Sequence, residues 1–220
     1  MIRTVLFDLD GTIMDTNELI IETFQHVLRD IVPQPFTREH IIPTMGMTLE
    51  EQLRGFSKRE DIEDLVQAYR DYNWKRHDDL ISPFPHVQEV IQRLVEASIQ
   101  VGIVTTKIRL TTERALRMFD LFDKMGAVIT FDDITNAKPH PEPVLRAVEM
   151  LGADPQATLM VGDSPADIQS ANAAGVISCG VAWSLKGEAL LKDYGAKHVL
   201  HDMRDLYALV GLERREGETT

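Results

Sequence analysis

The amino-acid sequence predicts an α/β protein, with a doubly wound, mostly parallel sheet and an inserted all-helical segment. Three observations support this fold class. Short apolar runs recur along the chain without polar alternation, which is typical of strands buried on both faces. Amphipathic helical patterns lie between these runs. A long segment after the first run contains helical patterns and no convincing strand, from residue 16 to about residue 82.

The predicted strands are short and rich in β-branched and aliphatic residues. They comprise Thr4–Phe7, Val101–Val104, Val128–Phe131, Leu159–Val161 and Val176–Val181. Two helical patterns between them have apolar residues spaced three or four apart, over Val87–Val95 and Val144–Leu151. Because such strands and helices alternate, we expect parallel strands joined by helices.

The helical insertion is predicted from the same spacing rule. Its apolar stripes are Ile20, Phe24, Val27, Leu28 and Ile31, and then Ile62, Leu65, Val66 and Tyr69. Thr48 with Glu51, and Ser57 with Glu60, match the capping-box spacing that marks helix starts. We therefore expect an α/β core formed by residues 1–15 and 82–220, and a helical cap formed by residues 16–81.

Composition and charge exclude several classes of protein. The chain of 220 residues is 44% hydrophobic and 26% charged, as is ordinary for globular proteins. Its net charge of −12 argues against nucleic acid as a partner. The longest uncharged stretch, Ile168–Leu185, contains several polar residues, so no membrane span is expected. The single cysteine, Cys179, cannot form an internal disulfide, which favours a cytoplasmic location.

Polar side chains follow the predicted strands, at the edge where an open parallel sheet binds its ligands. They are Asp8 and Asp10, then Thr105, Thr106 and Lys107, then Lys138, and finally Asp163 and Asp167. Neighbouring carboxylates repel one another unless a cation lies among them, and a site with few direct carboxylates suits Mg²⁺ and phosphate oxygens. One carboxylate can form an aspartyl-phosphate while a second acts as acid and base. The set therefore predicts metal-assisted phosphoryl transfer.

The order of these motifs resembles the haloacid dehalogenase superfamily of phosphohydrolases. The motifs are Asp8-x-Asp10-Gly11-Thr12, Thr105, Lys138-Pro139 and Gly162-Asp163-Ser164-x-x-Asp167. They extend over nearly the whole chain, with a helical segment after the first motif. The resemblance implies a Rossmann-like core and a Mg²⁺ cofactor.

The same resemblance implies a role for each site residue. Asp8 would be the nucleophile and Asp10 the general acid and base. Asp8, the Asp10 backbone carbonyl and Asp163 would bind Mg²⁺. Asp167 would lie next to these ligands without binding the metal itself. Thr105 would hydrogen-bond the phosphoryl oxygens. Lys138 would neutralise the charge shared by Asp8 and the phosphoryl group. Dehalogenases of the superfamily lack the second aspartate of the first motif, so dehalogenation is not expected.

A finer resemblance is to the PpaX-type inorganic pyrophosphatases of Gram-positive bacteria. It is carried by Thr16–Ile21, Gly102–Arg109, Lys138–Val144 and Gly180–Gly187. It implies hydrolysis of pyrophosphate, including that released when a kinase/phosphorylase dephosphorylates the carrier protein HPr. Phosphoglycolate phosphatases share most of these motifs but often have Asn at the position of Thr106.

Other functions stay open at this point. 2-Phosphoglycolate or another small phosphomonoester is the alternative substrate, and a sugar-phosphate mutase starts from the same aspartyl-phosphate. A phospho-accepting regulatory module belongs to a different class, but it needs neither a lid nor the acid/base group Asp10. The sequence does not fix the oligomeric state.

Several residues have two interpretations. Thr106 and Lys107 are candidate substrate contacts, although Lys107 also fits a solvated charge at a helix start. Asp167 also suits the first turn of a helix for its dipole alone. Pro43–Met47 is either a specificity loop or an ordinary connection. Another set, Lys75, Arg76 and His77, either reaches a second phosphate or forms a solvated helix face.

Overall fold

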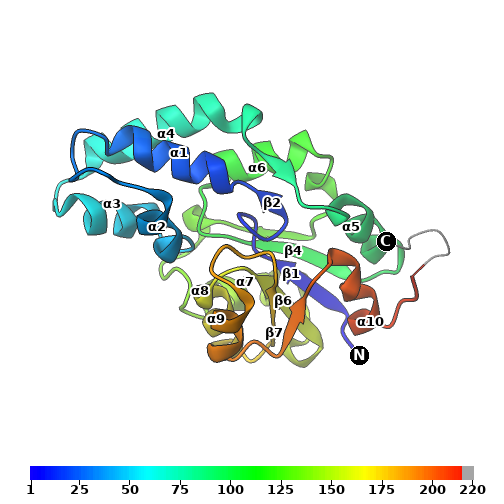
Figure 1. Ribbon diagram of the computed structural model, residues 1–220. Helices are drawn as coiled ribbons and strands as arrows, with labels where there is room; N and C mark the ends of the chain where they lie inside the picture. The colour runs from blue at the N-terminus through cyan, green and yellow to red at the C-terminus, as the bar shows by residue number, and fades with distance from the viewer. Residues whose placement is uncertain (215–220) are drawn as a thin grey trace.

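A six-stranded parallel sheet forms the centre of the computed structural model, which describes residues 1–214 (Figure 1). Its strands are β1 (Thr4–Phe7), β4 (Gln100–Val104), β5 (Ala127–Ile129), β6 (Thr158–Gly162), β7 (Ile177–Val181) and β8 (His198–Leu200). The strand order is β5-β4-β1-β6-β7-β8, and each neighbouring pair is parallel. The chain builds outward from β1 first to one side and then to the other, so strand order reverses at β1. This confirms the predicted doubly wound α/β class.

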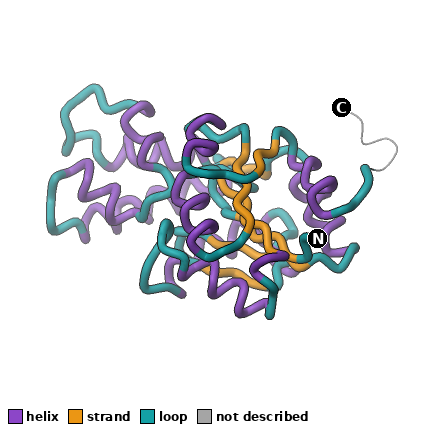
Figure 2. The backbone as a smooth tube through the Cα atoms, turned by 90° about the horizontal axis from the view of Figure 1, so that it is seen from below, coloured by secondary structure: helices purple, strands orange, loops and turns teal. Residues whose placement is uncertain are grey.

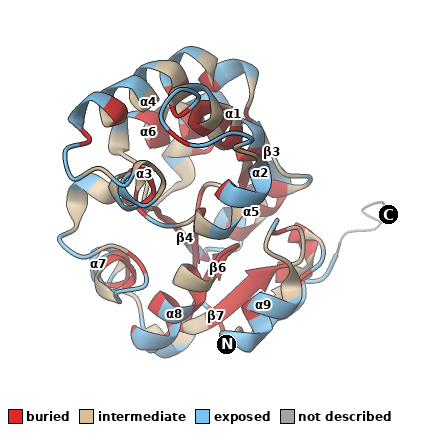
Figure 3. Ribbon diagram, turned by 60° about the vertical axis from the view of Figure 1, so that its left-hand side comes forward, coloured by how far each residue is buried: buried red, intermediate tan, exposed pale blue. Residues whose placement is uncertain are grey.

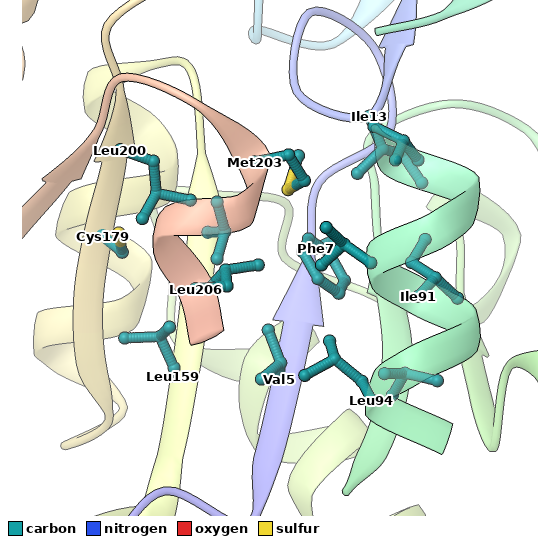
Figure 4. Close-up of a cluster of buried hydrophobic side chains, with 14 of the residues drawn as sticks. Val5, Phe7, Ile13, Ile91, Leu94, Leu159, Cys179, Leu200, Met203 and Leu206 are labelled. Carbon is teal, nitrogen blue, oxygen red and sulfur yellow. The ribbon is translucent and has the colours of Figure 1, made fainter. Parts of the chain in front are cut away.

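Helices cover both faces of this sheet. They are α5 (Val87–Glu96), α6 (Arg109–Met118), α7 (Glu142–Leu151), α8 (Pro165–Ala173), α9 (Glu188–Asp193) and α10 (Leu206–Val210). Successive strand residues point to opposite faces, so Val5 and Phe7 share a cluster with Ile91 of α5 (Figure 4). Leu6 packs in the other cluster, with Val144 of α7. All residues of β1 are buried, which explains why its sequence shows no polar alternation.

The inserted segment is helical and has its own core. It contains α1 (Asn17–Val27), α2 (Arg38–Ile41), α3 (Leu49–Ser57) and α4 (Glu63–Arg76). Phe24, Leu53 and Leu65 are buried together there. These helices are grouped to one side of the strands in Figure 2. No helix among residues 1–214 has the length and apolar character that crossing a membrane would require.

A short antiparallel ladder joins the segment to the sheet domain. Strands β2 (Met14–Asp15) and β3 (Ser82–Pro83) pair in it, with Met14 opposite Pro83. The chain thus leaves and re-enters the α/β part at adjacent points, immediately after the Asp8–Asp10 motif. Neither this ladder nor β8 was predicted, because their sequences (Met-Asp, Ser-Pro and His-Val-Leu) contain no continuous apolar run of three or more residues.

Two local predictions need correction. The strand predicted to reach Phe131 ends earlier, since β5 stops at Ile129. Phe131 instead starts a short 3-10 helix. Ser57 does not begin a helix but ends α3, where its hydroxyl donates to the Leu53 carbonyl at 2.7 Å. Lys58 then adopts a left-handed conformation, with φ of 57°, and stops the helix.

The other capping box is confirmed. The Thr48 hydroxyl accepts from the Glu51 N–H, and the Thr48 N–H donates to the Glu51 carboxylate. This box begins α3 directly after the loop that contains Gly46.

Figure 3 shows the buried strands beneath helices whose outer faces are exposed.

Candidate active site

Three of the expected site residues directly follow adjacent strands. Asp8 follows β1, and Thr105 and Asp163 follow β4 and β6, the two strands that pair with β1. The Asp8 N–H donates to the Val161 carbonyl at 2.9 Å, and the Thr105 N–H donates to the Ile129 carbonyl at 3.0 Å. Backbone pairing therefore continues to these residues and brings them to one edge of the sheet, where ligands bind in such folds.

Lys138 is buried at the centre of this edge. Its Nζ donates to Asp8 Oδ1 at 2.7 Å, to Asp167 Oδ1 at 2.5 Å and to the Val104 carbonyl at 3.0 Å. Burial by itself lowers the pKa of Lys138, but the neighbouring carboxylates outweigh burial and raise it well above the usual value. Lys138 is therefore a permanent ammonium that contacts the candidate nucleophile.

Three buried carboxylates form an acidic cluster. Oxygens of Asp8, Asp163 and Asp167 all lie within 4.8 Å of one another. Burial, with the charges of the other two carboxylates, raises the pKa of Asp8 well above its ordinary value despite Lys138. Burial likewise raises the pKa of Asp163 to about 6. The negative charge of this cluster exceeds the one ammonium that contacts it directly, so the cluster favours a cation.

Asp167 has both carboxylate oxygens engaged within the protein. Its Oδ1 accepts from Lys138, and its Oδ2 accepts from the Ser164 N–H at 3.0 Å and the Ser164 hydroxyl at 2.6 Å. These last bonds form the capping box of α8. Both interpretations from the sequence are therefore compatible with one geometry, in which Asp167 starts the helix and also orients Lys138.

The oxygen set fits a small hard cation. Asp8 and Asp163 carry carboxylate oxygens, the ligand type that Mg²⁺ prefers, and both are buried. Gly11 leaves space beside them, because a Cβ there would lie 2.6 Å from Asp163 Oδ2. Its φ of +81° is also a conformation that side chains disfavour. The turn at Gly11 thus brings the backbone close to the candidate metal ligand.

Asp10 is not one of the three clustered carboxylates and is paired with Lys107. The Lys107 Nζ donates to Asp10 Oδ1 at 2.8 Å, and both side chains are mostly buried. The Lys107 N–H also donates to the Thr105 hydroxyl at 3.2 Å. Lys107 is therefore not a solvated charge, and it links the candidate acid/base to the loop after β4.

The loop of the helical segment that contains Gly46 closes over this edge. A Cβ on Gly46 would lie 2.8 Å from Ser164 Oγ, so the two loops are in close contact. On the core side, the Lys186 ammonium donates to the Met45 carbonyl of that loop. The positive charge of Lys186 also opposes the rise in the pKa of Asp163. The Pro43–Met47 segment therefore contacts the core at Ser164 and Lys186, two residues next to the acidic cluster.

A cavity of about 370 Å³ separates the helical segment from the loop after β4. Asp10, Thr106 and Lys107 line it from the core side, and Arg70 and Asn73 of α4 line it from the other. The remaining wall is mostly apolar and includes Ile20, Met47, Leu49, Trp74, Leu110 and Phe131. The cavity thus adjoins the candidate acid/base and is lined by groups from both parts of the fold.

The basic residues that the sequence suggested at positions 75 to 77 do not line this cavity. Arg76 is paired with Glu22 at 3.0 Å and with Asp79 at 2.9 Å. Lys75 is exposed, and His77 is buried beside Asp78. Sequence reasoning missed Arg70, Asn73 and Lys186. The spacing of Arg70 and Asn73 by three residues, which places them on one helix face, was the available signal for the first two.

Comparison with known proteins identifies the family. The family model of haloacid dehalogenase-like hydrolases matches residues 5–181. The chain is 42% identical over 211 residues to the pyrophosphatase PpaX of Bacillus cereus (strain AH820), covering 95% of this chain and 96% of the relative. It is 40% identical to the PpaX of Anoxybacillus flavithermus (strain DSM 21510 / WK1), with 97% and 99% covered.

Solved structures show the same fold. A protein described as a haloacid dehalogenase-like hydrolase from Bacteroides fragilis is 29% identical, with a TM-score of 0.84 over 94% of this chain and all of that one. A protein described as a phosphoglycolate phosphatase from Lactobacillus plantarum is 25% identical, with a TM-score of 0.86 over 95% and 99%. The resemblance drawn from the motifs is confirmed: the chain belongs to the haloacid dehalogenase-like hydrolases, and PpaX pyrophosphatases are among its full-length relatives.

Proposed function

We propose that this protein hydrolyses inorganic pyrophosphate to phosphate, with Mg²⁺, through an aspartyl-phosphate on Asp8. The observation that carries the proposal is the buried contact between Lys138 and Asp8 in a cluster of carboxylates. Full-length identity of 42% to a PpaX pyrophosphatase supports the choice of substrate. The cytoplasmic location inferred from the single cysteine is part of the proposal.

In the first half-reaction, the Asp8 carboxylate attacks the phosphorus of one phosphoryl group. Lys138 and the Thr105 hydroxyl hold the oxygens of that group, and the bond from phosphorus to the bridging oxygen breaks. Asp10 gives its proton to the leaving phosphate. The pairing of Asp10 with Lys107, rather than with the acidic cluster, supports its separate role on the leaving-group side.

In the second half-reaction, water hydrolyses the aspartyl-phosphate. Asp10, now ionised, takes a proton from the water as its oxygen attacks phosphorus. The bond from phosphorus to the Asp8 oxygen breaks, which releases phosphate and restores the Asp8 carboxylate. The cycle consumes one water and leaves the protein unchanged.

The proposed Mg²⁺ ligands are Asp8, Asp163 and the Asp10 backbone carbonyl. Asp167 is not a ligand and orients Lys138 through their hydrogen bond. The bound cation supplies positive charge that favours ionised carboxylates and neutralises phosphate oxygens. Burial raises the pKa of Asp8 in the protein alone, and the charge of a bound cation would oppose that rise.

Residues 16–81 are the proposed cap. Their two ends meet at the β2–β3 ladder, and the Gly46 loop contacts the core at Ser164. Closing such a lid excludes bulk water from the acyl-phosphate step.

The test is phosphate release with MgCl₂, comparing kcat/KM for pyrophosphate and 2-phosphoglycolate, with Asp8→Asn as the blank. The proposal expects at least a tenfold preference for pyrophosphate, about 1.4 kcal/mol in transition-state binding. 2-Phosphoglycolate is the runner-up because of the structural likeness to the Lactobacillus plantarum protein. A preference for 2-phosphoglycolate overturns the substrate assignment and leaves the chemistry in place.

A further inference from the structure

The cavity beside Asp10 lies on the leaving-group side of the proposed reaction. Asp10 protonates the departing group, so that group must lie next to Asp10 at the moment of cleavage. Asp10, Lys107 and Thr106 form one wall of the cavity. When the substrate is pyrophosphate, the departing group is a phosphate, and its binding site needs cationic and hydrogen-bond donors.

Arg70 has one donor that residues 1–214 leave free, although its guanidinium forms a long ion pair with Glu50. Its Nε is buried and has no hydrogen-bond partner among residues 1–214. Its Nη2 lies 3.8 Å from Glu50 Oε1, which is beyond hydrogen-bond distance. A guanidinium with available donors beside a cavity is suited to the paired oxygens of a phosphate.

Asn73 provides a second observation that points to a ligand. Its residue surface is only 6% exposed, and it lines the cavity about one helical turn after Arg70. Within residues 1–214 its side-chain amide makes no hydrogen bond, and its polar atoms are not among the fully buried unpartnered ones, so the amide is open to the cavity. A bound oxyanion would satisfy this amide and the Arg70 Nε together.

The charges that line the cavity favour one bound anion beside α4, and they do not favour anions elsewhere in the cavity. Lys107 is already paired with Asp10, and the carboxylates of Glu50 and Asp71 also line the cavity. Asp71 is exposed and accepts a hydrogen bond from Gln67, so it belongs to the rim. Arg70 is therefore the cation that is least committed inside the cavity.

We propose that Arg70 and Asn73 bind the leaving phosphate and set the preference for pyrophosphate over phosphomonoesters that lack a second phosphate. This inference rests on the proposed function. Arg70 donates to two oxygens of the leaving phosphate, the Asn73 amide donates to a third, and Asp10 protonates the bridging oxygen. The proposed specificity contacts are therefore Arg70 and Asn73 on the cavity side of α4, and not Lys75, Arg76 and His77.

The experiment uses the full chain with MgCl₂ and four proteins: the unmodified chain, Arg70→Gln, Asn73→Leu and the control Arg29→Gln. Arg29 is an exposed arginine of the same helical segment. The first quantity measured is kcat/KM, with pyrophosphate, acetyl phosphate and 2-phosphoglycolate as substrates. The second is the inhibition constant of imidodiphosphate, a pyrophosphate analogue. Thermal unfolding of each variant checks that the fold is kept.

We expect Arg70→Gln to lower kcat/KM for pyrophosphate at least about tenfold, as for loss of a hydrogen bond to a charged group. Its kcat/KM for acetyl phosphate should change less than about threefold, and imidodiphosphate should bind at least about tenfold more weakly. Asn73→Leu should show the same pattern to a smaller degree, and Arg29→Gln should match the unmodified chain.

Equal losses for both substrates, or unchanged imidodiphosphate binding in Arg70→Gln, would overturn the inference. Failure of the proposed function has a different signature, because the unmodified chain would then prefer 2-phosphoglycolate to pyrophosphate. In a case where the unmodified chain hydrolyses pyrophosphate and Arg70→Gln does so equally well, the function stands and this inference is wrong.

Discussion

Replacing Lys138 with methionine should destabilise the metal-free protein strongly. The ammonium contacts Asp8 at 2.7 Å and Asp167 at 2.5 Å, and the three side chains are 2%, 8% and 1% exposed. At an effective dielectric constant of about 20, each pair has a Coulomb energy of about 6 kcal/mol before desolvation is subtracted. Methionine fills similar space but leaves both carboxylates buried without their cation, which typically costs about 3–5 kcal/mol.

The assay is thermal unfolding in EDTA at pH 7.5, where a loss of this size lowers Tm by about 6–20 °C. At pH 4 the deficit should shrink, because protonated carboxylates no longer need the ammonium. Lys75→Met, at an exposed lysine of α4, is the matched control and should change Tm by less than about 2 °C. A Tm for Lys138→Met equal to that of this control would refute the reasoning about the buried cluster.

Three further outcomes follow from the same geometry. Gly11→Ala should weaken the stabilisation by Mg²⁺ and lower Tm in Mg²⁺, because its Cβ would lie 2.6 Å from Asp163 Oδ2; unchanged values in a Mg²⁺ titration would contradict this. In EDTA, the free energy of unfolding of the unmodified chain should fall relative to that of Asp163→Asn as pH rises from about 4 to 6, by a few kcal/mol at most, because burial raises the pKa of Asp163 from 3.8 to about 6 and the folded state retains the proton. Mg²⁺ should flatten this pH dependence of Tm, and a parallel curve with and without Mg²⁺ would argue against the site. Cys179 is fully buried, and burial raises the pKa of its thiol to about 12, so it should react with a thiol reagent only after unfolding; rapid reaction in the native state would contradict that burial.

The sheet and the acidic cluster could be predicted from the sequence because local apolar runs predict the strands, and parallel pairing of the strands then brings distant residues together. Asp8, Thr105 and Asp163 each end an apolar run, and parallel strands bring such ends to one edge. The strands β2, β3 and β8 escaped prediction because polar residues or proline interrupt them, so they form no apolar run.

The inner surface of the helical segment could not be predicted for a different reason. Residues 70 to 77, on α4 and at the start of the 3-10 helix that follows it, all offer polar groups. Which of them face the cavity depends on how α4 packs on α1 and over the core. That packing buries Asn73, directs Arg76 to Glu22 and places Arg70 at the cavity. The contact of Lys186 with Met45 likewise joins residues 141 positions apart, and no local pattern reports it.

The most direct test of the central claim is the turnover of Asp8→Asn with pyrophosphate and MgCl₂. Asparagine keeps the size of the side chain and removes the nucleophilic carboxylate, so the fold should remain, with a Tm close to that of the unmodified chain. The account predicts a loss of kcat of at least about 10³-fold. Phosphate release by Asp8→Asn within tenfold of the unmodified chain would contradict catalysis through an aspartyl-phosphate on Asp8.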